Sequence, residues 1–201
     1  MERKNRFYNI CRHIFNFCFK KCCNVKIIDK ENIPKEGNII LAGNHRAFFD
    51  PCLTFISTDR QIHYLVKKEC VNNRFLGWAF KKLGCISIDR ENADIHGIKT
   101  AIRILKKGGA IGIFPEGTRN KTDNGLLTFK RGAVTLAQKT NAYIVPFGTT
   151  GDYRLRSNNL KIRYGKPFKV DNMSLQEANE RLKKEIEELI KQNLNEEERG
   201  E

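Results

Sequence analysis

Two residues whose types and spacing could support catalysis, His45 and Asp50, lie in the segment GNHRAFFDP (residues 43–51). Five residues on one continuous helix correspond to about 140° around the axis, so the chain must bend for the two side chains to meet. A helix with Asp50 as N-cap and Pro51 at its first position supplies that bend. A carboxylate that accepts the Nδ1–H of an imidazole fixes its tautomer, and the other ring nitrogen can act as a general base. Taken alone, such residues are more often a structural histidine and a helix cap.

A second polar segment, FPEGTRN (residues 114–120), combines Glu116, Gly117, Thr118 and Arg119. An arginine presents a planar fork suited to a phosphate, and a glycine lets backbone N–H groups approach it. Neither GxxxxGK[ST] nor GxGxxG occurs, so a nucleotide-binding loop is not predicted. In isolation the segment also fits a tight turn with a surface ion pair.

Two weaker segments follow other apolar runs. GCISIDR (residues 84–90) ends in Arg90, and IVPFGTTG (residues 144–151) contains Pro146. Each of them, considered singly, is typical of an ordinary strand end.

Hydrophobic periodicity places these segments at the ends of predicted strands. Strands are predicted over residues 38–42, 62–66, 85–88, 110–114, 142–147 and 160–164. Helices are predicted over 51–57, 73–83, 94–107 and 130–139, and a last one starts with the capping box at 174–177. The alternation predicts one α/β layered domain with a largely parallel central sheet flanked by helices. In such folds the sites lie at the carboxyl ends of the strands.

Residues 1–26 are predicted to form an N-terminal amphipathic helix that is basic and rich in phenylalanine. That pattern is typical of a helix that lies in a membrane interface, although a helix packed on its own domain is an equal alternative. No apolar run approaches the roughly 20 residues that a membrane-spanning helix needs. We expect a catalytic domain over residues 27–195 and an acidic flexible tail over 196–201.

The composition limits the classes of protein and partner. With 201 residues, 40% hydrophobic and 30% charged, the chain is predicted to be folded rather than disordered. Its net charge of +14 favours an anionic partner, which could be nucleic acid, an acidic membrane surface or a phosphorylated substrate. The seven cysteines lack CxxC spacing or a second Cys/His pair, so we predict reduced thiols and no metal site.

The order NHxxxxD, GxxxIDR, FPEGTR and VPFG resembles the four-motif signature of glycerolipid acyltransferases. The likeness is greatest to the 1-acyl-glycerol-3-phosphate acyltransferases, which acylate lysophosphatidic acid. The resemblance covers roughly residues 33–168 and includes the segments LVKKEC and FKRGAVTLAQKTNAYIVPFGTTG. Members of the family often carry an N-terminal hydrophobic span, whereas this chain has the short amphipathic segment.

The resemblance implies a role for each matching residue. His45 corresponds to the general base and Asp50 to its orienting partner, while Pro146 falls in the motif associated with acyl-chain or structural roles. Backbone N–H groups near Pro51 are the expected donors to the oxyanion. The residues implied to bind the glycerol phosphate are Lys67, with Lys68 as a competing assignment, Arg90, Glu116, Gly117, Thr118 and Arg119.

The expected reaction moves a fatty acyl group from an acyl carrier protein or coenzyme A thioester to the sn-2 hydroxyl of lysophosphatidic acid, giving phosphatidic acid. A thioester is already activated, so neither a cofactor nor a protein nucleophile is expected. The expected partners are these substrates and an anionic membrane, without nucleic acid, for a peripheral enzyme on the cytoplasmic face of the cell membrane. The alternatives are an acyltransferase for glycerol 3-phosphate or another lysophospholipid, and a noncatalytic basic protein that binds membrane or nucleic acid.

Overall fold

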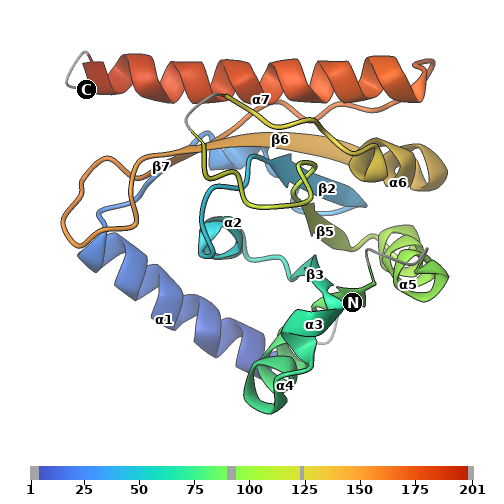
Figure 1. Ribbon diagram of the computed structural model, residues 1–201, viewed down its shortest axis with the longest axis horizontal. Helices are drawn as coiled ribbons and strands as arrows, with labels where there is room; N and C mark the ends of the chain where they lie inside the picture. The colour runs from blue at the N-terminus through green and yellow to red at the C-terminus, as the bar shows by residue number, and fades with distance from the viewer. Residues whose placement is uncertain (1–4, 90–93, 123–124, 199–201) are drawn as a thin grey trace.

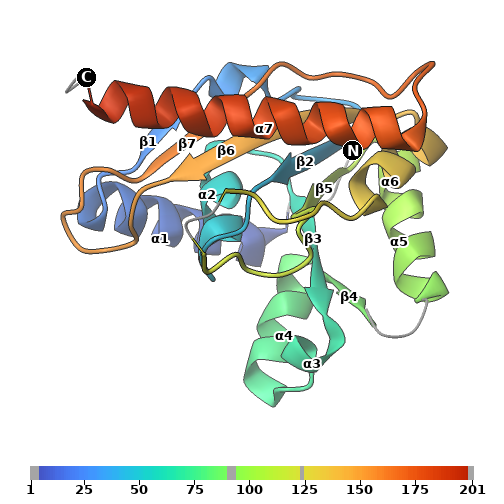
Figure 2. The same ribbon diagram turned by 45° about the horizontal axis from the view of Figure 1, so that its top comes forward.

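A seven-stranded sheet lies at the centre of the structure, a computed structural model that describes residues 5–89, 94–122 and 125–198. Helices cover both faces of the sheet (Figures 1 and 2). The strands are β1 (Lys26–Ile28), β2 (Ile39–Gly43), β3 (Ile62–Lys67), β4 (Ile86–Ile88), β5 (Ala110–Ile113), β6 (Tyr143–Thr150) and β7 (Lys161–Tyr164). The helices are α1 (Arg6–Cys22), α2 (Asp50–Ser57), α3 (Lys68–Val71), α4 (Arg74–Leu83), α5 (Ile95–Lys106), α6 (Gly132–Thr140) and α7 (Leu175–Glu198), with a short 3-10 turn at Lys30–Asn32. The predicted α/β class is confirmed.

The sheet is largely parallel, as predicted. Its strand order is β1-β7-β6-β2-β5-β3-β4, and among the described strands only β6 and β7 pair in antiparallel fashion. The five strands from β6 to β4 therefore run in one direction, and their carboxyl ends meet at one edge. Since β2 lies between β5 and β6, the loop after β2 has a neighbouring loop on each side.

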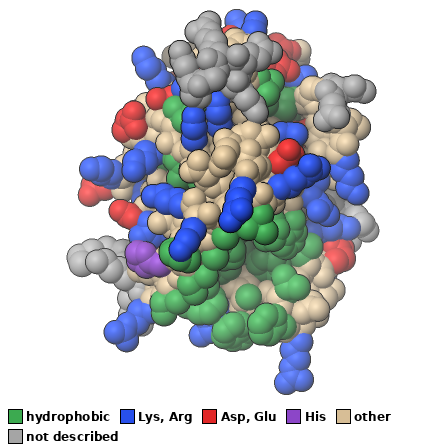
Figure 3. Space-filling view, turned by 90° about the vertical axis from the view of Figure 1, so that its left-hand side faces the viewer, with side chains coloured by type: hydrophobic (Ala, Val, Ile, Leu, Met, Phe, Trp, Pro, Cys, Tyr) green, Lys and Arg blue, Asp and Glu red, His purple; other side chains and the backbone are tan. Residues whose placement is uncertain are grey.

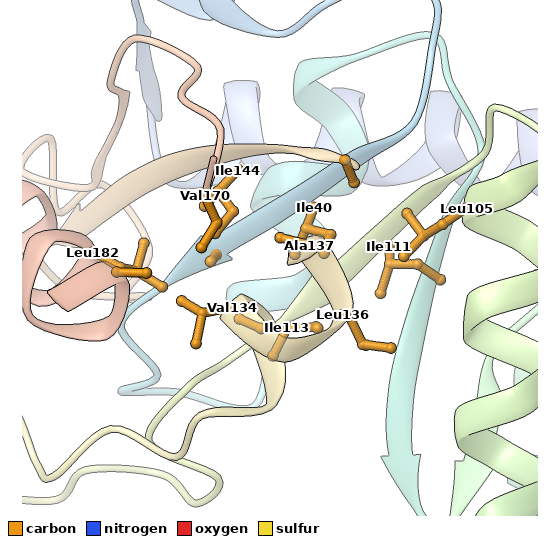
Figure 4. Close-up of a cluster of buried hydrophobic side chains, with 14 of the residues drawn as sticks. Ile40, Leu105, Ile111, Ile113, Val134, Leu136, Ala137, Ile144, Val170 and Leu182 are labelled. Carbon is orange, nitrogen blue, oxygen red and sulfur yellow. The ribbon is translucent and has the colours of Figure 1, made fainter. Parts of the chain in front are cut away.

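Two hydrophobic clusters hold the layers together, one on each face of the sheet. In β2, Ile40 contributes to the cluster beneath α5, α6 and α7, while Ile39 and Leu41 contribute to the cluster beneath α1 and α2. Figure 4 shows Ile40 in the first cluster, facing Ala137 of α6. A strand buried on both faces is typical of a parallel sheet, and each fully buried aliphatic side chain contributes about 1.5–3 kcal/mol.

Helix α1 packs one face against the domain and exposes the other. Tyr8 and Phe19 are buried, and the Tyr8 hydroxyl accepts a hydrogen bond of 3.0 Å from the Ile62 N–H. On the outer face three apolar side chains are more than half exposed, namely Ile10 (58%), Ile14 (57%) and Phe17 (63%). The predicted amphipathic helix is confirmed, with one face packed against the domain and the other exposed.

Helix α7 extends to Glu198, past the expected end of the folded domain at residue 195. Its last turns are held by two cations of β7. Arg163 forms ion pairs with Glu196 and, at 3.0 Å, with Asp29, and the buried Lys161 donates to the Asn193 carbonyl at 3.1 Å. These contacts order the first part of a segment whose acidic composition alone predicted a flexible tail.

The other predicted helices and strands are present, with bounds that differ by about one to three residues. The short β1 and α3 were not predicted, because three or four residues are too few to show a periodic pattern. The start of α2 also differs from the prediction. Asp50 is the first helical residue rather than the N-cap, which is Phe49, and its carboxylate turns back toward residues 46 and 47.

Candidate active site

The loops after β2, β5 and β6 meet at one edge of the sheet because these strands are parallel neighbours. His45 follows β2 by two residues, residues 114–119 follow β5 directly, and Tyr153 lies three residues beyond β6. Asn44 joins the first loop to β6 through two hydrogen bonds with Thr149, of 2.9 and 2.8 Å. This side-chain pairing fixes the backbone that presents His45.

His45 and Asp50 form a hydrogen-bonded pair, as their spacing predicted. The distance from His45 Nδ1 to Asp50 Oδ2 is 2.9 Å, and because an ionised carboxylate can only accept, the proton lies on Nδ1. The backbone N–H groups of Arg46 and Ala47 donate to the same oxygen at 2.6 and 2.7 Å, so the intervening chain wraps around the carboxylate. Asp50 is fully buried and His45 is partly exposed. His45 Nε2 is therefore the nitrogen available to take a proton.

Several of the backbone N–H groups near Pro51, where oxyanion donors are expected, are engaged within the protein. The N–H groups of Asp50 and Cys52 donate to the carbonyls of Ala47 and Phe49, at 3.3 and 2.8 Å. Pro51 has no N–H, and the N–H groups of Arg46 and Ala47 bind the Asp50 carboxylate. An oxyanion donor in this turn therefore stays a prediction for its other N–H groups.

Tyr153 makes a contact that the sequence did not indicate. Its hydroxyl donates to Asp50 Oδ1 at 2.5 Å. Burial raises the pKa of Tyr153 well above its ordinary value, and the Asp50 charge raises it further, so the phenol stays protonated at neutral pH. The two residues are 103 positions apart in the chain, and no motif or periodic pattern marks Tyr153.

Glu116 is buried and joins two loops instead of facing an open site. One carboxylate oxygen accepts from the His45 N–H at 2.8 Å, and the other accepts from the Leu127 N–H at 3.0 Å. The Asn120 N–H donates to the His45 carbonyl at 2.7 Å, and the Phe114 ring stacks on the imidazole with a centroid distance of 4.1 Å. This geometry lets Glu116 position the backbone of His45, and the predicted substrate contact of Glu116 stays a prediction.

Gly117 occupies a turn that requires glycine. Its φ of +69° lies in the left-handed region, and its N–H donates to the Phe114 carbonyl at 3.0 Å. A Cβ at this position would also lie 2.9 Å from Lys130 Cε. The turn therefore brings the Lys130 side chain against the EGTR segment. Lys130 belongs to the FKRG sequence at residues 129–132, and the sequence motifs gave it no role.

Arg119 and Thr118 are exposed in the loop after β5. Within the described ranges, no acidic side chain forms an ion pair with Arg119. The exposed guanidinium is thus suited to bind an anionic substrate group. Arg90, the arginine of the second motif, lies outside the described residues.

Lys67 and Lys68 follow the strand next to β5. Lys67 is the last residue of β3, and its Nζ lies 3.6 Å from Glu69 Oε2. Lys68 Nζ lies 3.8 Å from Asp89 Oδ2. The edge formed by the parallel strands therefore carries Lys67 on the same side as Arg119, as the sequence predicted.

A cavity of about 230 Å³ opens beside the His45–Asp50 pair, between the loops after β2, β5 and β6. Its lining includes two cations, Arg46 and Lys121, one acidic residue, Asp152, and the polar residues Asn120 and Tyr153. The two cations can bind an anionic group, and the acidic residue partly offsets their charge. Sequence motifs did not single out these cations, because each stands next to a motif residue without belonging to the pattern.

Cys52, in the first turn of α2, does not provide a thiolate nucleophile. Burial raises the pKa of the Cys52 thiol to about 12, and the neighbouring Asp50 charge acts in the same direction. The pKa of Cys85 is likewise raised by burial, to about 11. Both thiols are protonated at neutral pH, so neither is a ready nucleophile.

Residues 24–150 match the family model named Acyltransferase, and the chain belongs to this family of enzymes. Among its relatives, a 1-acyl-sn-glycerol-3-phosphate acyltransferase of Bacillus subtilis strain 168 is 33% identical over 180 residues, which are 87% of this chain and 89% of the relative. An enzyme with the same name from Streptococcus pneumoniae is 30% identical over 75% of this chain and 58% of that protein.

A solved structure shows the same fold. The crystal structure of the 1-acyl-sn-glycerophosphate acyltransferase from Thermotoga maritima matches with a TM-score of 0.74. The match covers 92% of this chain and 77% of the other, at 21% sequence identity.

Proposed function

We propose that this acyltransferase moves a fatty acyl group from an acyl carrier protein or coenzyme A thioester to the sn-2 hydroxyl of 1-acyl-glycerol 3-phosphate, producing phosphatidic acid. The observation that carries the proposal is the His45–Asp50 contact of 2.9 Å, at the edge of the sheet where cations of neighbouring loops gather. The names of the relatives favour the same acceptor.

In the proposed reaction, His45 Nε2 takes the proton of the sn-2 hydroxyl while the oxygen attacks the thioester carbonyl. The C–S bond then breaks, and the leaving thiolate receives that proton from the imidazolium. Asp50 stabilises the imidazolium through its bond to Nδ1. General-base catalysis of this kind contributes about 10²–10⁴-fold, and the thioester supplies the activation that a covalent intermediate would otherwise provide.

The identity of the acceptor is tested by measuring how fast the purified wild-type protein acylates three different acceptors. With acyl-coenzyme A or acyl carrier protein thioester as donor, we expect lysophosphatidic acid to be acylated faster than glycerol 3-phosphate or lysophosphatidylcholine. Mass spectrometry identifies the product as phosphatidic acid. Faster acylation of glycerol 3-phosphate would instead establish the alternative acceptor.

Arg119→Ala tests the binding of the acceptor phosphate. Because a hydrogen bond to a charged group contributes about 1.5–3 kcal/mol, we expect kcat/KM for lysophosphatidic acid to fall about 10–100-fold, chiefly through KM. Steady-state kinetics of thioester release measure this change. Arg103→Ala is the matched control, since Arg103 is exposed in the last turn of α5, and an equal effect of both substitutions would refute the assignment.

We also propose that the protein binds peripherally to the anionic cytoplasmic face of the membrane. Within residues 5–89, 94–122 and 125–198, no helix is long and apolar enough to cross a bilayer. Near the end of α1, the buried Phe19 ring contacts the Phe49 ring at a centroid distance of 6.2 Å. Phe49 and its neighbour Phe48 are exposed and stand between His45 and Asp50 in the chain, so they add apolar surface beside the site. Figure 3 shows hydrophobic side chains gathered on the face at the left of Figure 1, with lysine and arginine side chains above them.

A triple substitution of the outer face of α1, Ile10→Ser, Ile14→Ser and Phe17→Ser, tests this docking. Deleting α1 would be less informative because Tyr8 and Phe19 belong to the core. Since interfacial binding scales with buried apolar area, we expect the variant to bind vesicles of phosphatidylcholine and phosphatidylglycerol at least about 10-fold more weakly in a sedimentation assay.

The matched control for this docking is Leu194→Ser, which removes an exposed apolar side chain from α7, on the opposite face of the sheet from α1 (Figure 1). It should bind these vesicles as the wild type does. Unchanged binding of the triple variant would mean that the outer face of α1 does not contact the membrane.

A further inference from the structure

We propose that Tyr153 is a positioning residue for acyl transfer, whose hydroxyl holds the Asp50 carboxylate in the orientation that serves His45 and whose ring is held in place by helix α1. The inference rests on the proposed function, since it concerns the same histidine and aspartate. It adds a third side chain to the pair and gives α1 a role within the catalytic centre.

The two carboxylate oxygens of Asp50 have different partners. Oδ2 accepts from His45 Nδ1 and from the backbone N–H groups of Arg46 and Ala47, whereas Oδ1 accepts from the Tyr153 hydroxyl at 2.5 Å. With partners on both oxygens, the carboxylate cannot rotate about its Cβ–Cγ bond without breaking hydrogen bonds. Asp50 is fully buried, so losing the phenol would leave a charged oxygen short of a donor away from water.

The Tyr153 side chain is suited to this task because its hydroxyl stays protonated and the side chain is largely buried. Burial and the Asp50 charge raise the pKa of Tyr153 well above its ordinary value, so the hydroxyl can donate at neutral pH. Neighbouring Arg46 acts in the opposite direction on the pKa of Tyr153, but as the smallest of the contributions.

Helix α1 holds the Tyr153 ring from the side. The Phe19 ring meets it edge-on, at a centroid distance of 6.0 Å and an interplanar angle of 77°, and the Phe49 ring lies 6.2 Å away. The Arg156 N–H donates to the Cys22 carbonyl at the end of α1, at 2.7 Å, which ties the loop of Tyr153 to the helix. Phe19, on the buried face of α1, is therefore linked to Asp50 through one side chain, that of Tyr153.

The substitution Tyr153→Phe keeps the ring and removes the hydroxyl. On a short-chain lysophosphatidic acid below its micelle concentration, we expect kcat to fall about 10-fold or more, as for the loss of a hydrogen bond to a charged group. The acceptor KM should stay close to the wild-type value, and the melting temperature should fall by only a few degrees, because one oxygen of the buried carboxylate loses its donor. Tyr143→Phe is the matched control, because Tyr143 lies at the opposite end of β6, and it should leave kcat unchanged.

A second pair of variants tests the role of α1. Phe19→Leu removes the edge contact on Tyr153, and Phe168→Leu makes the same change in the cluster on the other face of the sheet. Below the melting temperatures of both, we expect kcat on the monomeric acceptor to fall several-fold in the first variant and to stay at the wild-type value in the second. Equal kcat values in the two variants would overturn the role of α1.

The outcomes separate this inference from the proposed function. A kcat for Tyr153→Phe within twofold of wild type, together with an inactive His45→Ala, would refute the role of Tyr153 alone. Activity retained by both variants would refute the His45 mechanism itself. A changed KM or a lowered melting temperature for Tyr153→Phe, with kcat unaltered, would show that the phenol is merely structural.

Discussion

Replacing His45 by alanine should reduce turnover by about 10²–10⁴-fold, the range expected when a general base is lost. The imidazole is partly exposed and stacks on one face against Phe114, so its removal leaves the hydrophobic clusters intact. The change should appear in kcat with lysophosphatidic acid as acceptor, measured as thiol release from the acyl thioester, while the circular dichroism spectrum stays that of the wild type.

His96→Ala is the control for this experiment. His96 is exposed on α5 and lies outside the loops that form the site, so its loss should leave turnover unchanged. Turnover of His45→Ala within a few-fold of the wild type would contradict general-base catalysis by this residue.

Asp50→Asn should reduce kcat by about 10³–10⁴-fold, because a neutral amide neither stabilises the imidazolium nor selects the same tautomer. The substitution has a second cost. Four donors face this buried side chain, and an amide nitrogen placed among them leaves at least one donor without an acceptor. We therefore expect a loss of about 1–3 kcal/mol in the free energy of unfolding, measured by urea denaturation.

Asp171→Asn provides the comparison, since Asp171 is exposed in the turn before α7 and its charge should affect neither kcat nor stability. If Asp50→Asn kept more than a tenth of the wild-type kcat, the carboxylate would not be orienting His45. A large loss of stability with normal kcat would make Asp50 a structural residue only.

Much of the fold and the central pair could be predicted from the sequence because they depend on local patterns. Alternating apolar runs and capping residues gave the order of strands and helices, and parallel strands bring their carboxyl ends to one edge. The contact between His45 and Asp50 needed only a bend, which the proline at position 51 indicated. In each case the signal lies within about ten consecutive residues.

The remaining features depend on partners far away in the chain. Tyr153 reaches Asp50 across 103 positions, and nothing near it distinguishes it from a surface tyrosine. The charged side chains of Lys161 and Arg163 in β7 would suggest an exposed strand face, yet both are buried against α7. The inward orientation of Glu116 is equally nonlocal, because its partners are the N–H groups of His45 and Leu127.

The cross-link made by Glu116 has a consequence for how activity is lost. Its carboxylate accepts hydrogen bonds from two backbone N–H groups, that of His45, 71 positions earlier in the chain, and that of Leu127, 11 positions later. Because this carboxylate links the two loops, opening either contact would loosen the backbone that presents the imidazole. We therefore expect heat or denaturant to lower activity as these contacts break.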